Sequence, residues 1–271
     1  MAFAPILLNA NNPGPMTGTG NNTYLLVAAG QATLVDAGVG EPRHLDALRD
    51  ALAARAARLD RVLVTHGHAD HASGATAIAT AHPDASFAKR PWPGQDEQYD
   101  VQWQALDDGT QIAVGVERLR VLHTPGHSPD HLAFWHEPSG TIFTGDLVVL
   151  GSSVMIHTSK GGNLAQYMQS LERLRTLAPR RLLPAHGPAI ENPEALLTGY
   201  LEHRRLREQQ VLTALEAGHQ TVEAIAESIY HGLDSALMAA ARENVRAHLA
   251  KLETDAAAMR DDDRWRRKRY R

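Results

Sequence analysis

The segment His66-Gly67-His68-Ala69-Asp70-His71 places four side chains that can bind a metal ion within six residues. A β-branched run, RVLVT at 61–65, directly precedes it and is typical of a buried strand. The chain must turn where this strand ends, and we expect Gly67 to permit an unusual backbone angle there. Imidazole nitrogens suit zinc and related metals, and a carboxylate complements them. The segment therefore predicts a metal site at the end of a strand.

Three later residues are further candidate ligands. His127 lies in TPGHS (124–128), Asp146 ends FTGD (143–146) and His186 lies in PAHGP (184–188). Each follows a predicted strand, and functional groups in α/β proteins gather at the carboxyl ends of strands. Two clustered cations would also need an anionic bridging ligand, for which Asp146 is the natural choice. The four segments together favour a shared metal site.

A structural role is the alternative for any single histidine. The chain has 15 histidines, and the ten outside the predicted site are interpreted as structural, His44, His82, His203 and His248 among them. His123 and His136 read as ordinary strand residues. For HGHADH, taken with His127, Asp146 and His186, the metal interpretation is strongly favoured.

The predicted elements supply a scaffold for such a site. Short strands occur in two groups with helices between them, which fits a sandwich of sheets covered by helices. The expected elements are a hairpin at 22–38, a helix from Pro42, the strand 61–65, a small-residue helix after His71, a loop at 90–109, four strands between 111 and 150, a helix at 163–177, the strand 181–186 and a helix at about 193–217.

From about residue 218 the pattern changes to short amphipathic helices and a terminal hairpin, which indicates a small winged-helix-like module. Its last strand, RWRRKRYR, has two interpretations. The basic residues could grip a phosphate backbone while Trp265 and Tyr270 stack on bases. They could instead form the charged outer face of the hairpin. The preceding DDD and the net charge of −4 favour the second interpretation.

Composition bounds the function classes. With 271 residues, 43% of them hydrophobic, the chain is an ordinary globular protein. It has no cysteine, so disulfides are excluded and a metal site must use His, Asp or Glu. No apolar run is long enough to cross a membrane, and the N-terminus lacks the features of a signal peptide. We expect a cytoplasmic protein without a membrane partner.

The motif HxHxDH, followed in order by a His, an Asp and a His, resembles the metallo-β-lactamase superfamily over roughly residues 20–190. The resemblance implies an α/β (α+β) fold, an αββα sandwich with a dinuclear site at one edge. It implies that His66, His68 and His127 hold a first metal, that Asp70, His71 and His186 hold a second, and that Asp146 bridges them. Class B1 β-lactamases use a cysteine at the second metal, so this chain resembles the hydrolase branches instead.

A closer resemblance is to the β-lactamase-like protein 2 group. It rests on GNNTYL (20–25), TPGHSPDH (124–131), YMQSLERL (167–174), PAHGPAIENP (184–193) and HRRLREQQ (203–210). It implies a catalytic domain at 1–195 and a winged-helix-like domain at 196–271. The best-known animal member is an endoribonuclease acting on single-stranded RNA, and some fungal relatives are thioesterases. One departure is the Ala-Ser-Gly after His71, where the superfamily usually has a Gly-Gly pair.

These features predict a hydrolase with two zinc ions, with manganese or iron as alternatives. Two metals ~3.5–4 Å apart can lower the pKa of a shared water, and the bridging hydroxide is then the nucleophile. Asp70 is the predicted catalytic residue, which orients this hydroxide. His131 could support the site or simply start a strand. Asn21, Asn22 and Tyr24 are expected to satisfy turn hydrogen bonds, with a role in the site as the alternative. The loop 151–162 is expected to be solvated, although its His157 and Lys160 could instead face the substrate.

Three functions remain open. The first is hydrolysis of a thioester, ester or other small acyl substrate. The second is endoribonuclease action on single-stranded RNA. The third is a nucleic-acid-binding module with structural metals, which the seven-ligand set disfavours because structural zinc sites are usually closed four-ligand sites. The partner is therefore a small molecule or single-stranded RNA, and a homodimer is also open.

Overall fold

The computed structural model describes residues 3–268, which divide into two units. The first unit comprises residues 3–124, 130–152 and 177–194, and the second comprises residues 125–129, 153–176 and 195–268. Two segments before residue 195 thus group with the C-terminal part of the chain. The division after residue 195 expected from the sequence stays a prediction.

The first unit contains a six-stranded sheet with the order β1-β2-β3-β4-β5-β6. Strands β1 to β3 are antiparallel, as the predicted hairpin requires, whereas β3 to β6 are parallel. The strands are β1 (Ile6–Asn9), β2 (Asn22–Ala28), β3 (Gln31–Val35), β4 (Arg58–Leu63), β5 (Ser86–Lys89) and β6 (Trp103–Ala105). The expected loop at 90–109 therefore contributes β6 and a 3₁₀ turn at Asp96–Gln98.

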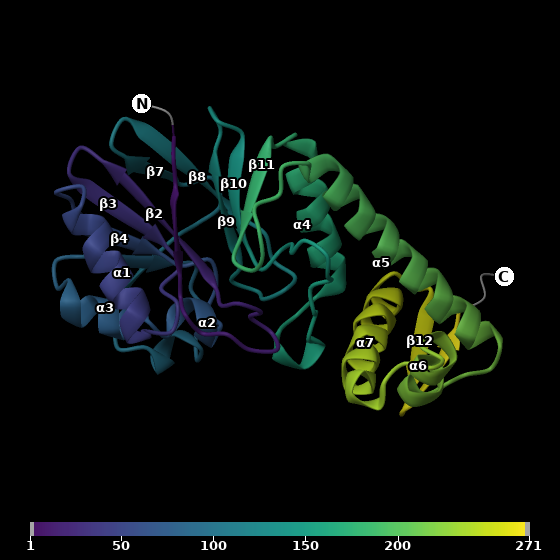
Figure 1. The fold of residues 1–271 in the computed structure, drawn as a ribbon. Coiled ribbons are helices and arrows are strands. Elements are labelled where there is room, and N and C mark those ends of the chain that lie inside the picture. The colour runs from purple at the N-terminus through teal and green to yellow at the C-terminus, as the bar shows by residue number, and fades with distance from the viewer. Residues whose placement is uncertain (1–2, 269–271) are drawn as a thin grey trace. The chain divides into compact units, whose positions relative to one another are not determined.

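Helices cover one face of this sheet (Figure 1). They are α1 (Pro42–Ala53), α2 (Ala69–Ala72) and α3 (Ala75–Ala81). Leu48 and Leu52 of α1 lie four residues apart, so they share one face of the helix. With Ile78 of α3 they pack in the hydrophobic core between these helices and the sheet. Pro42 suits the first turn of α1 because its missing N–H would have no partner there.

A second, five-stranded sheet packs against the other face of the first. Its order is β11-β10-β9-β8-β7, antiparallel except for the β10–β11 pair. The strands are β7 (Gln111–Val114), β8 (Glu117–His123), β9 (Leu132–His136), β10 (Thr141–Gly145) and β11 (Arg181–Pro184). Leu26 and Leu63 of the first sheet share a buried core with Phe134 and Phe143 of the second. The first unit is thus a sandwich of two sheets with helices on one outer face.

The parallel pairs of strands position the candidate ligands. β4 ends at Leu63, just before the HGHADH segment, while β10 ends at Gly145, one residue before Asp146. β11 ends at Pro184, two residues before His186, and Gly145 pairs with Pro184 in the ladder. Because parallel strands end at the same edge of a sheet, Asp146 and His186 emerge side by side.

The second unit contains α4 (Leu164–Thr176), most of α5 (Pro193–Glu216), α6 (Val222–Ile229), α7 (Met238–Thr254), β12 (Ala258–Asp261) and β13 (Arg264–Arg267). Val211 of α5, Ile225 of α6, Leu249 of α7 and Trp265 of β13 share one hydrophobic core. The antiparallel pairing of β12 with β13 confirms the predicted terminal hairpin. Among the described helices, none combines the length and hydropathy required to cross a bilayer.

Candidate metal centre

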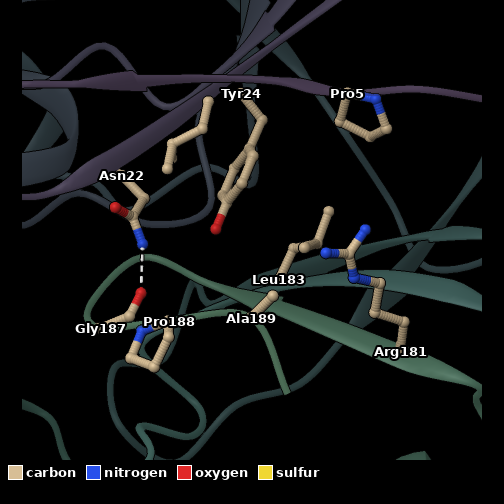
Figure 2. Close-up of a pocket in the computed structure, with 9 residues that line it drawn as sticks. Pro5, Asn22, Tyr24, Arg181, Leu183, Gly187, Pro188 and Ala189 are labelled. Carbon is tan, nitrogen blue, oxygen red and sulfur yellow. Dashed lines mark hydrogen bonds between the residues drawn. The ribbon is translucent and has the colours of Figure 1, made fainter. Parts of the chain in front are cut away.

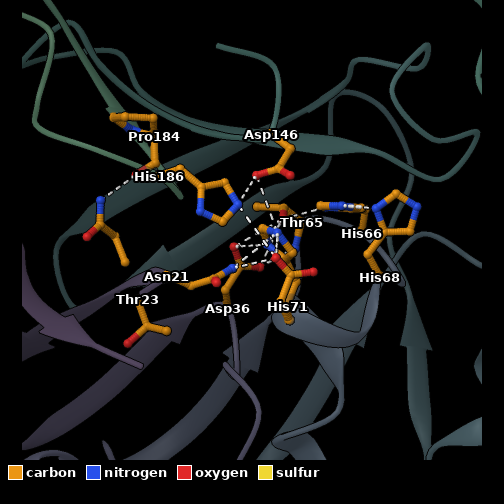
Figure 3. Close-up of polar contacts among 12 residues, drawn as sticks. Asn21, Thr23, Asp36, Thr65, His66, His68, His71, Asp146, Pro184 and His186 are labelled. Atoms are coloured by element: carbon orange, nitrogen blue, oxygen red, sulfur yellow. Dashed lines mark hydrogen bonds and ion pairs between the residues drawn. The ribbon is translucent and has the colours of Figure 1, made fainter. Parts of the chain in front are cut away.

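Four predicted ligands converge within the first unit. Asp70, His71, Asp146 and His186 each offer one ligand atom, and these atoms lie within 4.8 Å of one another. Nε2 of His186 lies 3.1 Å from Oδ1 of Asp146 and 3.5 Å from Oδ2 of Asp70. Nε2 of His71 lies 3.3 Å from the same Asp146 oxygen (Figure 3). We call this set the carboxylate half-site.

The two carboxylates of the carboxylate half-site, Asp70 and Asp146, give it a negative charge that favours bound cations. Burial raises the pKa of the Asp70 and Asp146 carboxyls, but the charge of His71 outweighs it and holds both pKa values below the usual range. Burial likewise lowers the pKa of His71, but the carboxylates of Asp70, Asp146 and Asp36 hold it well above its ordinary value. The two anions thus draw a positive charge into a buried site, and bound metal ions would supply that charge instead.

Asp36 orients His71 from behind. Its Oδ2 lies 2.9 Å from Nδ1 of His71, and its Oδ1 accepts hydrogen bonds from the backbone N–H and the hydroxyl of Thr65. A carboxylate on one ring nitrogen fixes the tautomer and presents the other nitrogen to a metal. Asp36 was not predicted from the sequence, although it directly follows β3, whose parallel neighbour β4 leads to HGHADH. A polar residue at that strand end was the available signal.

Asn21 contacts Asp70 directly. Its Nδ2 donates a 3.0 Å hydrogen bond to Oδ2 of Asp70, and the side chain is buried. The side-chain amide of Asn12 holds Asn21 through two 2.9 Å bonds, one to its carbonyl oxygen and one from its backbone N–H. The sequence favoured a turn role for Asn21, which its bonds to Asn12 confirm, and the bond to Asp70 adds a contact with the predicted site. Asn22 and Tyr24 do bond to the backbone as expected, both donating to the carbonyl of Pro184.

His131 supports the site rather than merely starting a strand. Its Nε2 accepts a 3.1 Å hydrogen bond from the backbone N–H of Asp146, and its Nδ1 lies 2.8 Å from the hydroxyl of Thr124. Gly145 adopts a φ of +48° and leaves no room for a side chain, because a Cβ there would lie 2.8 Å from Nε2 of His131. The turn that carries Asp146 is therefore fixed on its backbone side.

The remaining histidines belong to the predicted first metal. Nε2 of His66 and Nδ1 of His68 lie 2.9 Å apart in the first unit, and the Thr65 hydroxyl contacts Nδ1 of His66. His127 lies on the segment 125–129 of the second unit, where its Nδ1 lies 3.0 Å from the carbonyl of Met155. The membership of His127 in the first-metal set stays a prediction.

Gly67 has a different role from the one predicted. Its φ is not in the left-handed region, so the expectation of an unusual backbone angle was wrong. The glycine is needed instead because there is little room for a side chain at this position. A Cβ would lie 3.0 Å from Cγ of Gln95, 3.3 Å from Oδ2 of Asp130 and 3.4 Å from Cε3 of Trp92. Neighbouring groups therefore approach the backbone between His66 and His68 closely.

The donor set fits divalent transition metals. The first unit brings four imidazoles and two carboxylates, from His66, His68, Asp70, His71, Asp146 and His186, to the ends of its strands. Imidazole and carboxylate ligands suit zinc, iron and manganese, and the chain has no thiolate to offer a softer metal.

A small cavity of about 120 Å³ is lined in part by residues 187–189, which directly follow His186 (Figure 2). It is lined by Pro5, Leu7, Asn22, Tyr24, Arg181, Leu183, Gly187, Pro188 and Ala189. None of these is a predicted ligand, and the volume is below the ~300–1,000 Å³ usual for small-molecule sites. One of its lining residues, Asn22, stabilises the turn after His186, because its Nδ2 donates a 2.7 Å hydrogen bond to the carbonyl of Gly187.

In the described part of the basic C-terminal strand, Trp265 is buried and two arginines pair with acidic residues. Trp265 is 8% exposed and packs in the core of the second unit, so it is not available to stack on bases. Arg266 pairs with Asp261 at 2.6 Å, and Arg267 pairs with Glu216. Tyr270 lies outside the described residues. The hairpin thus has the charged outer face that the sequence favoured.

Comparison with known proteins gives the family context. Residues 16–186 match the model of the metallo-β-lactamase superfamily, and residues 221–265 match that of a β-lactamase-associated winged helix domain. The chain is 32% identical to a β-lactamase-like protein 2 homolog of Caenorhabditis elegans, over 90% of this chain and 82% of that protein. It is 35% identical to an atrochrysone carboxyl ACP thioesterase of Aspergillus fumigatus, over 76% of this chain and 62% of that protein.

A solved metallo-β-lactamase family protein from Thermus thermophilus shares the fold. It superposes with a TM-score of 0.79 over 97% of this chain and 98% of its own, at 23% identity.

Proposed function

Because the chain belongs to the metallo-β-lactamase superfamily, we propose that it is a dinuclear zinc hydrolase that acts on thioesters or related small acyl esters. A metal-dependent hydrolase is what the family and its His/Asp cluster establish. The zinc, the two-metal stoichiometry and the acyl substrate are the proposal. The observation that carries it is the carboxylate half-site, in which two partly buried carboxylates share two histidines.

His66, His68 and His127 hold the first metal in this proposal, while Asp70, His71 and His186 hold the second. Asp146 would be the ligand shared by the two metals; its Oδ1 lies 3.3 Å from Nε2 of His71 and 3.1 Å from Nε2 of His186, among the second-metal ligands. Two divalent cations bound there would supply a shared water of lowered pKa and would polarise the scissile carbonyl.

The protein's own groups orient the reaction. Asp70 stays ionised because its pKa lies below the usual range, so its oxygens can accept a hydrogen bond from the attacking water. Asn21 fixes one of those oxygens, which sets the direction of the other. Asp36 orients the ring of His71, and His131 accepts a hydrogen bond from the backbone of Asp146 and so fixes its position. Burial of these groups excludes competing solvent dipoles and strengthens their electrostatic effect.

The charge distribution supports an acyl substrate. The formal net charge is −4, and arginines of the terminal hairpin are paired with acidic neighbours. A thiolate is a good leaving group because a thiol has a pKa near ~8.5, so a thioester needs no general acid. The similarity to the atrochrysone carboxyl ACP thioesterase agrees with this substrate class.

Cleavage of single-stranded RNA is the second candidate, favoured by the similarity to the β-lactamase-like protein 2 homolog over 90% of the chain. The third function, a binding module with structural metals, does not fit this site. Its site would be closed, whereas the family and the mixed half-site belong to hydrolases.

The decisive experiment is an activity panel on the purified protein loaded in turn with zinc, manganese and iron. The substrates are an acyl thioester, an aryl ester, a lactone, a β-lactam, an aryl phosphodiester and end-labelled single-stranded RNA. Asp70→Ala and chelation should abolish turnover, whereas Asp84→Asn, at an exposed turn, should not change it. Preferred turnover of the thioester supports the proposal. Cleavage of RNA without hydrolysis of any acyl substrate would contradict the acyl-hydrolase proposal and support the endoribonuclease. Turnover that does not depend on metal would contradict both functions.

A further inference from the structure

Gly67, which separates the two first-metal histidines His66 and His68, is bound through both of its backbone groups. Its N–H donates a 2.8 Å hydrogen bond to Oδ2 of Asp130. Its carbonyl accepts 3.0 Å bonds from Nε2 of Gln95 and from the hydroxyl of Tyr99. Side chains from two distant segments thus hold the backbone that carries these histidines.

One buried cation joins those segments. Lys89, the last residue of β5, is 0% exposed, and its Nζ lies 3.0 Å from the same Oδ2 of Asp130 that binds Gly67. The ammonium group also pairs with Asp96 and donates to the carbonyl of Arg90 at 2.7 Å. The second oxygen of Asp96 accepts from the backbone N–H of Trp92 at 2.7 Å. Lys89 therefore links Asp130 to the loop 92–99.

The loop 92–99 lies against the first-metal histidines. The ring centroids of Trp92 and His68 are 6.1 Å apart, and the same loop supplies Gln95 and Tyr99 to the Gly67 carbonyl. Without the ammonium group, the buried carboxylate of Asp130 and the partly buried carboxylate of Asp96 would both lose the cation that they share. A buried ion pair that loses one partner leaves the other charge unsatisfied, so the loop and Asp130 would move apart.

We propose that Lys89 is a positioning residue for the first metal: through Asp130 and the loop 92–99 it holds Gly67, and thereby sets the geometry of His66 and His68. The inference rests on the proposed two-metal function. It predicts an effect confined to one metal, because the carboxylate half-site is held by a separate group of residues, Asn21, Asp36 and His131.

The test measures Zn²⁺ affinity by competition with a chromophoric chelator, with each metal isolated in turn. His186→Ala removes a ligand of the second metal, so the tightest zinc binding that remains measures the affinity of the first site. His66→Ala removes a ligand of the first metal, so in that variant the tightest binding measures the affinity of the second site. In the His186→Ala background, Lys89→Met should weaken zinc binding by roughly 10–100-fold, the usual effect of losing an outer partner of a ligand. In the His66→Ala background, zinc affinity should stay unchanged.

Arg90→Met is the matched control. It removes a neighbouring cation whose partner, Asp107, is exposed, so neither affinity should change. Equal weakening of both sites by Lys89→Met would indicate a general structural role and overturn the inference, as would no weakening at all. If Lys89→Met does not fold, Asp96→Asn decides, since it weakens the same link at a partly exposed carboxylate and should give a smaller loss confined to the first site.

The proposed function fails separately. A wild-type protein that binds fewer than two zinc ions contradicts the dinuclear site whatever Lys89 does. Two bound zinc ions with no selective loss in the Lys89 variant contradict only the positioning role.

Discussion

We call the strand ends of the first unit that carry the predicted metal ligands the metal edge. This edge and the terminal hairpin of the second unit each contain a dense run of residues that could bind a ligand. HGHADH has four potential ligands in six residues, and RWRRKRYR has six basic residues in eight. The structure treats them in opposite ways. At the metal edge the side chains turn inward and meet residues from other strand ends. In the described part of the hairpin, Arg266 and Arg267 are solvent-exposed and pair with acids, while Trp265 is buried in the core.

Local density of residue types is therefore a weaker sign of a site than convergence from distant segments. Asn21 and Asp70 are 49 positions apart, and Gly67 and Asp130 are 63 apart, yet each pair is hydrogen-bonded. The hairpin pair Arg266–Asp261 spans five positions and satisfies itself locally. A local pair between exposed groups contributes little energy, whereas a buried network specifies one geometry.

The largest effect should follow from Asp146→Ala. It removes the oxygen shared by His71 and His186, so two cations would lose their bridging anion. We expect hydrolysis to fall by more than the ~10–100-fold that loss of an outer partner costs, together with loss of bound metal. Metal content by plasma emission spectroscopy and turnover of the best substrate check this. Retention of two zinc ions would contradict the bridging role.

Trp265→Ala should cost about 3–5 kcal/mol of unfolding free energy, because it empties a large buried position. Urea unfolding followed by circular dichroism measures the loss. The opposite result, unchanged stability with weaker binding of single-stranded RNA, would show that this indole stacks on bases and would remove the contrast between the two regions.

Acid should destabilise the first unit through His44, a buried histidine that is not a predicted ligand. Burial lowers the pKa of His44 from 6.5 to about 4, and its Nε2 contacts the Thr23 hydroxyl at 2.8 Å. Since the folded pKa is below the unfolded one, the unfolded chain binds the proton first. Stability from this group is complete above pH 6.5 and is lost as the pH falls towards 4.

At about 1.4 kcal/mol for each pKa unit, this loss amounts to roughly 3 kcal/mol. Unfolding free energies of the metal-free protein at several pH values should fall less steeply for His44→Gln than for the wild type over that window. Parallel curves for the two proteins would show that His44 is not buried in its neutral form.

Asp36→Asn should reduce zinc affinity of the carboxylate half-site by roughly 10–100-fold, because an amide cannot hold the His71 tautomer as a carboxylate does. The first site, isolated as described for Lys89, should lose less affinity, because Asp36 reaches His66 only through the Thr65 hydroxyl. An equal loss at both sites would mean that the two metal sites are not held independently.

The smallest effect belongs to the hairpin. Arg266→Gln breaks an ion pair between side chains that are 53% and 64% exposed, so stability should change by less than about 1 kcal/mol. The salt dependence of any RNA binding should also stay the same. A flatter salt dependence would show that this arginine contacts phosphates and would support a nucleic-acid role for the hairpin.

Much of the fold could be predicted from the sequence. The hairpin of β2 and β3, the strands that end before HGHADH, Asp146 and His186, and the C-terminal helices with their hairpin all follow from local patterns of apolar and turn residues. The strand β1 was not predicted, because ILLN at 6–9 is short and its pairing with β2 is decided by the sheet. The grouping of α4 with the C-terminal part likewise depends on packing.

The sequence by itself determined the chemistry of the candidate site: imidazoles and carboxylates, no thiolate, in an order that marks the family. The tertiary structure decided which groups contact its predicted ligands, namely Asp36, Asn21 and His131. It also decided that Gly67 is needed for close approach rather than for its backbone angle. The physical reason is that residue type and spacing fix what a side chain can do and where a strand ends, whereas distances between strand ends depend on how the sheets pair and pack.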